Sequence, residues 1–174
     1  GKFNSDLGAS EAGKCLDCAK GRYNSFSGSH SCQPCPPRSY CNATQMTRAT
    51  ECPMGAASLK KESEECSVCV AGRYQSESGS AACELCPAGT YSATAGSPSN
   101  ATCSACPEGK FTSQPGASAC SACPKGSFQD AVGQTECKEC SEEYDDETLT
   151  SNDAGDGCVL KPDLQSFSLV TTIY

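Results

Sequence analysis

Cysteine is the residue type in this sequence whose chemistry and spacing could define a site. Seventeen of the 174 residues are cysteine, and most recur as C-x-x-C pairs. The pairs are Cys15/Cys18, Cys32/Cys35, Cys66/Cys69, Cys83/Cys86, Cys103/Cys106, Cys120/Cys123 and Cys137/Cys140. Thiolates at this spacing can ligate zinc, exchange with other thiols, or be oxidised to structural disulfides.

The surrounding residues favour structural disulfides. Cys18 and Cys32 lie about as far apart as the two halves of a zinc ribbon, but His30 is the only histidine and the net charge is −8. A Pro-x-Gly-x-aromatic sequence also follows the second cysteine of several pairs, which a zinc site does not require. Redox use of the thioredoxin type needs a βαβ setting that this Gly-, Pro- and Ser-rich sequence does not offer. We therefore expect neither a metal nor a cofactor.

The composition predicts an extracellular chain stabilised by covalent cross-links. Tryptophan is absent, and the sequence has only 6 Tyr and 5 Phe. So few apolar side chains cannot build one large core, and small units of this kind depend on disulfides that persist in oxidising compartments. The acidic pI of about 4.6 argues against nucleic acid or an anionic membrane as a partner. No apolar run could span a bilayer and no signal peptide precedes the repeats, so we expect a piece of a longer protein.

The pairs recur with a common step that defines a repeat. Most steps are 17 residues, one is 20, and the step from Cys32 to Cys66 is 34, twice the common value. Cys52 therefore holds the second position of a hidden pair whose first position is Ala49. The missing cysteine is found instead at Cys41. The repeat that contains Cys41, which we call the altered repeat, keeps the 17-residue register but changes its disulfide pairing.

The residues between the pairs predict turns and short strands. A Gly two positions before an aromatic residue suits a turn, as do the Pro after the second cysteine and a second Gly before the next pair. We expect β-hairpins and no helices. The aromatic side chain is expected to cover the disulfide as a one-residue core. These aromatic residues are Tyr23, Tyr40, Tyr74, Tyr91, Phe111 and Phe128.

The simplest wiring pairs the second cysteine of each dyad with the first cysteine of the next. The predicted disulfides are Cys18–Cys32, Cys35–Cys41, Cys52–Cys66, Cys69–Cys83, Cys86–Cys103, Cys106–Cys120, Cys123–Cys137 and Cys140–Cys158. Cys35–Cys52 with Cys41–Cys66 is the alternative around the altered repeat, because sequence alone does not fix connectivity. Cys15 is left over, and its partner is expected upstream of Gly1.

The pattern C-x-x-C-P-x-G-x-[YF] resembles the ephrin-receptor-like cysteine-rich repeat, and also the first half of a tumour-necrosis-factor-receptor module. Residues 86–91 and 106–111 carry the resemblance best, and it extends from residue 1 to about 140. It implies an elongated array of stacked modules on a cell surface or in a secreted assembly. Similar arrays occur in protist and algal surface proteins, including flagellar-hair subunits. The extra cysteines of a complete tumour-necrosis-factor-receptor module are absent, which argues against a cytokine receptor.

Two asparagines lie in acceptor sequences for N-linked glycans. These are Asn42-Ala43-Thr44 and Asn100-Ala101-Thr102, and Asn100 falls in the longest step between pairs. In an extracellular chain we expect a glycan at one or both of these sites, although unmodified asparagine is the alternative.

Two further groups of residues are weaker candidates for chemistry. The acidic run at 142–147, with Asn152, Asp153 and Asp156, could bind calcium, but Asn152-x-Ala154-x-Asp156-Gly157 departs from the EF-hand pattern. A solvated acidic loop is the simpler interpretation. His30 could act as a general acid or base, yet no nucleophile signature surrounds it, so an exposed loop histidine is expected.

The sequence therefore predicts small disulfide-rich repeats in four segments. Residues 1–17 form a partial repeat, 18–140 the tandem repeats, 141–160 a degenerate acidic repeat, and 161–174 a linker with a β-strand that starts another segment. We predict a non-enzymatic extracellular rod, part of a larger surface or appendage glycoprotein, whose partners are copies of itself or other surface subunits. A ligand-binding receptor ectodomain is the alternative, with Arg22, Tyr23, Arg73 and Tyr74 as its candidate anchors.

Overall fold

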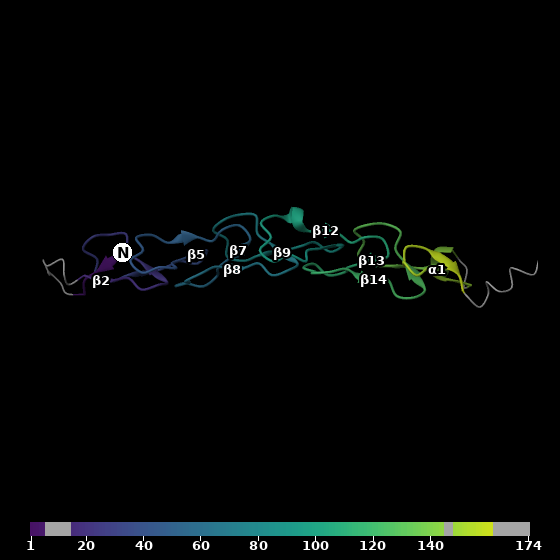
Figure 1. Ribbon diagram of the computed structural model, residues 1–174, viewed down its shortest axis with the longest axis horizontal. Helices are drawn as coiled ribbons and strands as arrows, with labels where there is room; N and C mark the ends of the chain where they lie inside the picture. The colour runs from purple at the N-terminus through teal and green to yellow at the C-terminus, as the bar shows by residue number, and fades with distance from the viewer. Residues whose placement is uncertain (6–14, 145–147, 162–174) are drawn as a thin grey trace, which may run out of the picture. The chain divides into compact units, whose positions relative to one another are not determined.

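The computed structural model describes residues 1–5, 15–144 and 148–161 (Figure 1). The chain divides into two compact units. The first contains Gly1–Glu84 and Thr94–Thr102, and the second contains Leu85–Ala93 and the described residues from Cys103 onward. The predicted strand at 167–174 and most of the linker before it lie outside the described residues.

The first unit is built from antiparallel hairpins of two-residue strands. Its pairs are β1 (Lys2–Phe3) with β2 (Leu16–Asp17), β3 (Arg22–Tyr23) with β4 (Gln33–Pro34), β5 (Ser39–Tyr40) with β6 (Thr50–Glu51), and β7 (Ala56–Ala57) with β8 (Ser67–Val68). A further hairpin joins β9 (Arg73–Tyr74) to β10 (Glu84–Leu85), where the chain enters the second unit. A 3-10 helix, η2 (Asn100–Thr102), also belongs to the first unit. In each of these hairpins except β5–β6, the second strand consists of the two residues between the cysteines of a pair, whereas β6 lies between Ala49 and Cys52.

The second unit repeats the same construction. Its pairs are β11 (Thr90–Tyr91) with β12 (Ser104–Ala105), β13 (Lys110–Phe111) with β14 (Ser121–Ala122), β15 (Ser127–Phe128) with β16 (Lys138–Glu139), and β17 (Leu149–Ser151) with β18 (Cys158–Leu160). The predicted class of small, hairpin-based, disulfide-rich repeats is confirmed. The expectation of no helix is wrong at two places, because η2 is a 3-10 helix and α1 (Cys140–Tyr144) is an α-helix. This stretch reads Cys-Ser-Glu-Glu-Tyr and lacks the Gly and Pro that prevent helices elsewhere.

Eight disulfides form the interior of the repeats. They join Cys18–Cys32, Cys35–Cys41, Cys52–Cys66, Cys69–Cys83, Cys86–Cys103, Cys106–Cys120, Cys123–Cys137 and Cys140–Cys158. These are the pairs that the repeat register predicts, and around the altered repeat the structure has Cys35–Cys41, not the alternative wiring. Cys15 is unbonded and exposed.

The core differs from the expected stack of aromatic rings. Among the described residues Phe128 is the one fully buried aromatic side chain, and the buried apolar set otherwise consists of cysteines and two alanines. The other aromatic residues of the repeats are half-buried. The physical reason is size, because most of these two-residue hairpins leave a ring partly exposed, whereas a disulfide fits beneath them. The cysteines themselves are therefore the core.

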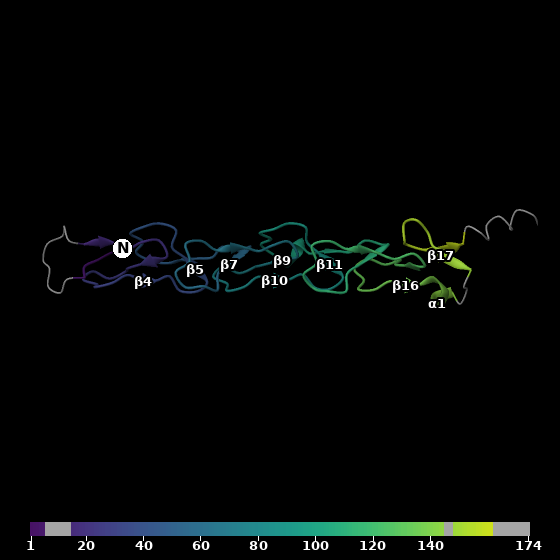
Figure 2. The same cartoon turned by 90° about the horizontal axis from the view of Figure 1, so that it is seen from below.

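Backbone hydrogen bonds connect each repeat to the next within a unit. The N–H of Gly55 donates to the carbonyl of Gln75 (2.9 Å), that of Ser58 to Ser80 (3.1 Å), and that of Gly79 back to Cys52 (2.8 Å). Residues at the corresponding positions of the second unit make the same three bonds. Within the first unit, β5, β7 and β9 accordingly follow one another in chain order in both views (Figures 1 and 2). We call this set of bonds the backbone ladder.

The ladder explains one of the glycine positions in each repeat. Gly55 has a φ of +78°, and a Cβ there would lie 2.2 Å from the carbonyl oxygen of Gly96. Any side chain would therefore both strain the backbone and collide with a neighbouring repeat. At the equivalent position the altered repeat carries Arg38, which adopts a φ of 73° in spite of its side chain.

Candidate interaction surface

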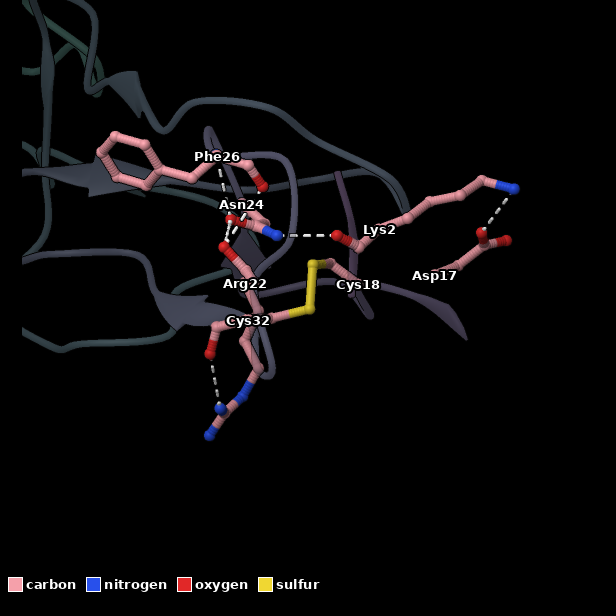
Figure 3. Close-up of a disulfide and its surroundings, with 8 residues drawn as sticks. Lys2, Asp17, Cys18, Arg22, Asn24, Phe26 and Cys32 are labelled. Carbon is pink, nitrogen blue, oxygen red and sulfur yellow. Dashed lines mark hydrogen bonds and ion pairs between the residues drawn. A yellow bond between two sulfur atoms is a disulfide. The ribbon is translucent and has the colours of Figure 1, made fainter. Parts of the chain in front are cut away.

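A buried polar residue follows the aromatic position of each repeat and holds the next loop in place. Figure 3 shows the first example, beside the Cys18–Cys32 disulfide. The side-chain oxygen of Asn24 accepts a hydrogen bond from the N–H of Phe26 (3.1 Å), and its amide donates to the carbonyl of Lys2 (2.6 Å). Asn24 is only 3% exposed. Because its amide is satisfied on both sides, it can be buried without a desolvation cost.

Gln75 shows the same arrangement. Its side-chain oxygen accepts from the N–H of Glu77 (3.0 Å) and its amide donates to the carbonyl of Ala82 (2.7 Å), which closes the loop between them. The sequence interpretation missed this position, although a polar residue occupies it in every repeat between residues 18 and 137 except the altered one. The buried set comprises Asn24, Ser58, Gln75, Ser92, Thr112 and Gln129.

Cys41 occupies that position in the altered repeat. It is fully buried, and its bond to Cys35 stands where the other repeats have a side-chain hydrogen bond. The N–H of Cys41 still donates to the carbonyl of Ser63 (2.9 Å), so the backbone ladder continues through this repeat. In this repeat the Cys35–Cys41 disulfide therefore replaces the side-chain hydrogen bonds that the buried polar residue makes elsewhere.

The hairpin β7–β8 is flanked by two surface hollows. At the aromatic position this repeat has Ala57, where its neighbours in the same unit have Tyr40 and Tyr74. A missing ring leaves space that packing does not fill. The signal was present in the sequence, since this is the one repeat between residues 18 and 137 without Tyr or Phe at that position.

The first hollow, which we call the Asn42 groove, has a volume of about 500 Å³. Tyr40 and Asn42 line it from the altered repeat, and Ala56 and Val68 line it from β7 and β8. Its remaining lining residues are Lys20, Pro53, Glu64, Glu65 and Cys66. The groove therefore combines an aromatic ring and apolar walls with charged groups.

The second hollow, which we call the Leu59 groove, has a volume of about 460 Å³ and shares Glu64, Glu65 and Val68 with the lining of the first. Leu59, Val68 and Val70 line it and are 75%, 60% and 62% exposed. Arg73 lies in the same lining. Exposed apolar side chains that converge on one concave surface are typical of protein-interaction sites.

Two of the other candidate anchors, Arg22 and Tyr74, are occupied by contacts inside the first unit. Arg22 pairs with Glu62 and also donates to the carbonyl of Cys32 (3.3 Å). The hydroxyl of Tyr74 donates to Glu84 (2.8 Å), and this bond to a carboxylate raises the pKa of Tyr74 above its ordinary value of 10.0. Of the anchors that the receptor alternative needs, Arg73 is the one placed at a groove.

Both glycan-acceptor asparagines lie at the surface. Asn42 is exposed at the rim of the Asn42 groove, and Asn100 is exposed at the start of η2. The hydroxyl of Thr102 donates to the carbonyl of Ser99 (2.8 Å). Glycosylation of these residues stays a prediction.

The weaker candidates of the sequence are explained by local structure. The amide of Asn152 donates to Asp156 (2.7 Å), whose N–H donates back to Asn152 (3.2 Å), so these side chains close the β17–β18 turn. The part of the acidic run at residues 145–147 lies outside the described residues. Within the described part of the chain, no group of three His, Cys, Asp or Glu side chains is arranged to hold a metal. His30 is exposed, with Nδ1 at 3.3 Å from the carbonyl oxygen of Asn4.

The hairpins, the eight disulfides and the backbone ladder define a small disulfide-rich repeat protein. A family model described as tyrosine-protein kinase ephrin type A/B receptor-like matches residues 55–103 and 117–156, more than half of the chain. The chain belongs to this ephrin-receptor-like family. A search of curated proteins finds no match. Repeats of this family with many disulfides are typical of extracellular interaction modules. In the described residues, no helix has the length and apolar character needed to cross a membrane.

Proposed function

We propose that this chain is a non-enzymatic extracellular rod, a segment of a larger cell-surface or appendage glycoprotein that makes protein–protein contacts along its length. The observation that carries the proposal is that each repeat uses one set of residues to fold and stack and another set to form its exposed surface. The cysteines and the backbone ladder use the same positions every time, so the stack can be extended without a large apolar core. Each repeat contacts mainly its neighbours, which favours an elongated array.

The residues between paired cysteines supply the variable surface of this rod. In strands β2, β4, β6, β8, β10, β12 and β14 both residues are exposed. Their side chains differ from repeat to repeat, for example Ser67-Val68 in β8 and Ser121-Ala122 in β14. Because the fold does not depend on them, these positions are free to carry specificity for a partner.

The disulfides and the glycan acceptors support the extracellular side of the proposal. Eight disulfides in 174 residues require an oxidising compartment. Two exposed acceptor asparagines are consistent with passage through a secretory pathway. The partners are copies of this chain or other surface subunits, as in a flagellar-hair-like filament, and the net charge of −8 disfavours nucleic acid.

The test uses the full chain, secreted from eukaryotic cells with its disulfides intact. Sedimentation velocity should give a frictional ratio well above that of a compact sphere of the same mass, and raising the concentration should produce larger species of regular size. Electron microscopy of those species should show end-to-end or lateral contacts. A compact particle that stays monomeric at every concentration would overturn the rod and its self-association together.

A receptor ectodomain is the second candidate, and the Leu59 groove is the observation that favours it. Three exposed apolar side chains converge there and form the kind of patch that marks protein-interaction sites, and Arg73 is of a residue type enriched in interface hot spots. This candidate predicts a monomer that captures a protein ligand. Loss of capture in Arg73→Ala, with capture unchanged in Arg48→Ala outside the groove, would select it over the rod.

A further inference from the structure

We infer that the Asn42 groove seats the first sugars of an N-linked glycan attached to Asn42. The inference rests on the proposed function, because it requires an extracellular chain that is glycosylated. It goes further by assigning an occupant to a specific surface. The glycan would be bound on the protein that carries it, not displayed freely in solvent.

The position of the acceptor carries the argument. Asn42 is itself part of the groove lining and is exposed, so a sugar on its amide nitrogen starts inside the hollow. Thr44, the other residue that the acceptor sequence requires, is also exposed. The volume of about 500 Å³ falls within the range of roughly 300–1,000 Å³ typical of small-molecule sites. The groove is therefore large enough for a short saccharide.

The chemistry of the walls matches a sugar. One face of a pyranose ring carries C–H groups and packs against an aromatic ring or aliphatic side chains, and Tyr40, Ala56 and Val68 supply such a surface. The hydroxyl and acetamido groups at the ring edge need hydrogen-bond partners. Glu64 and Glu65 supply acceptors at the wall, and Lys20 supplies a donor.

Asn100 provides a matched control within the same unit. It is exposed like Asn42 but lies in η2 and is not among the residues that line either groove beside β7–β8. A glycan there would start outside both grooves. The two acceptors therefore differ in the feature on which the inference depends.

The test measures how fast peptide N-glycosidase removes each glycan from the folded, non-reduced protein, followed by glycopeptide mass spectrometry. We expect release at Asn42 to be about tenfold slower than at Asn100, the ratio that about 1.4 kcal/mol of contact with the groove produces. After reduction and denaturation the two rates should become equal. Equal rates on the folded protein would overturn the inference.

Two substitutions on β8 and the residues after it separate groove contact from simple crowding. Val68→Asp removes an apolar wall of the Asn42 groove, whereas Val70→Asp changes a side chain of similar exposure that lies only in the Leu59 groove. Val68→Asp should accelerate release at Asn42 toward the Asn100 rate, and Val70→Asp should not. Slow release that persists in Val68→Asp would contradict the inference.

The same data distinguish this inference from the proposed function. A glycan on Asn100 with none on Asn42 would overturn the inference that the Asn42 groove binds a glycan, but it would still agree with a secreted glycoprotein. Free thiols and no glycan at either site would overturn both.

Discussion

Replacing Gln75 with leucine tests whether the buried polar residue holds the loops that connect the repeats. Leucine has nearly the same volume but cannot form the two hydrogen bonds of the glutamine amide, to the N–H of Glu77 and the carbonyl of Ala82. Each bond contributes about 1 kcal/mol net, so the opening of the loop should become about 2 kcal/mol easier. That free energy corresponds to an opening constant about 30 times larger.

The backbone ladder should transmit this change to the preceding repeat. The loop closed by Gln75 contains Gly79, whose N–H donates to Cys52, and Ser80, whose carbonyl accepts from the N–H of Ser58. Native-state hydrogen exchange should therefore show about 30-fold faster exchange at the amides of Gly79 and Ser58, although Ser58 lies far from the substitution in sequence. Gln33→Leu, at an exposed position of β4, is the control and should leave both amides unchanged. If Ser58 exchanges at the same rate in Gln75→Leu and in the unsubstituted protein, the assigned role of the polar residue is refuted.

Three further predictions concern backbone strain and ionisation. Arg38→Gly should raise the free energy of unfolding by about 1 kcal/mol, because glycine adopts the φ of 73° without strain. Denaturant unfolding with intact disulfides measures this change, and an unchanged unfolding midpoint would contradict it. Gly55→Ala should lower the free energy of unfolding by at least about 3 kcal/mol, and Gly28→Ala by only about 1 kcal/mol. Both glycines have positive φ, but a Cβ at Gly28 meets nothing within 4 Å. Similar losses of stability in thermal unfolding of the two variants would contradict the close contact at Gly55. Tyr74 should titrate above 10.0 by NMR, because its hydroxyl donates a hydrogen bond to the Glu84 carboxylate, and its pKa should return toward 10.0 in Glu84→Gln. Because the folded-state pKa is raised, the contribution of this bond to stability is complete below pH 10 and declines as the pH rises through the raised pKa.

Because cysteines form the core in place of the expected aromatic rings, the source of the stability also differs. The two cysteines of a disulfide such as Cys52–Cys66 lie 14 residues apart, a loop whose closure stabilises by about 3 kcal/mol in the chain-entropy model. The half-buried rings contribute less than full burial would. Stability should therefore depend mainly on the disulfides, and reduction should unfold the repeats even at neutral pH and low temperature.

The altered repeat and its neighbour concentrate the irregular features of the first unit. Arg38, Gln45 and Glu62 adopt positive φ without being glycine. Two of them contact the preceding repeats through their side chains, since Glu62 pairs with Arg22 and Gln45 donates to Asp17 (2.9 Å). These contacts offset part of the backbone strain. The Asn42 groove lies in the same stretch, where the pattern of the other repeats is interrupted.

The sequence alone was sufficient for the features that repeat at short range. The common step of 17 residues set the register and the hairpins, and it indicated the altered pair at Cys41 and Cys52. Disulfide partners in this fold are 6 to 18 residues apart, so the wiring is a local property that the pattern can express. Turn glycines and prolines are likewise read from neighbouring residues.

Tertiary structure decided what depends on contact between repeats. The backbone ladder joins residues 20 or more positions apart through groups that every residue carries, so no side-chain pattern announces it. The burial of Gln75 and its equivalents, and the half-exposure of the aromatic rings, follow from how much room a stacked hairpin leaves. The Asn42 groove has walls from different repeats, because Tyr40 and Asn42 line it from the altered repeat and Ala56 and Val68 line it from β7 and β8. A local pattern cannot specify such a hollow, because its walls are brought together only when the repeats stack.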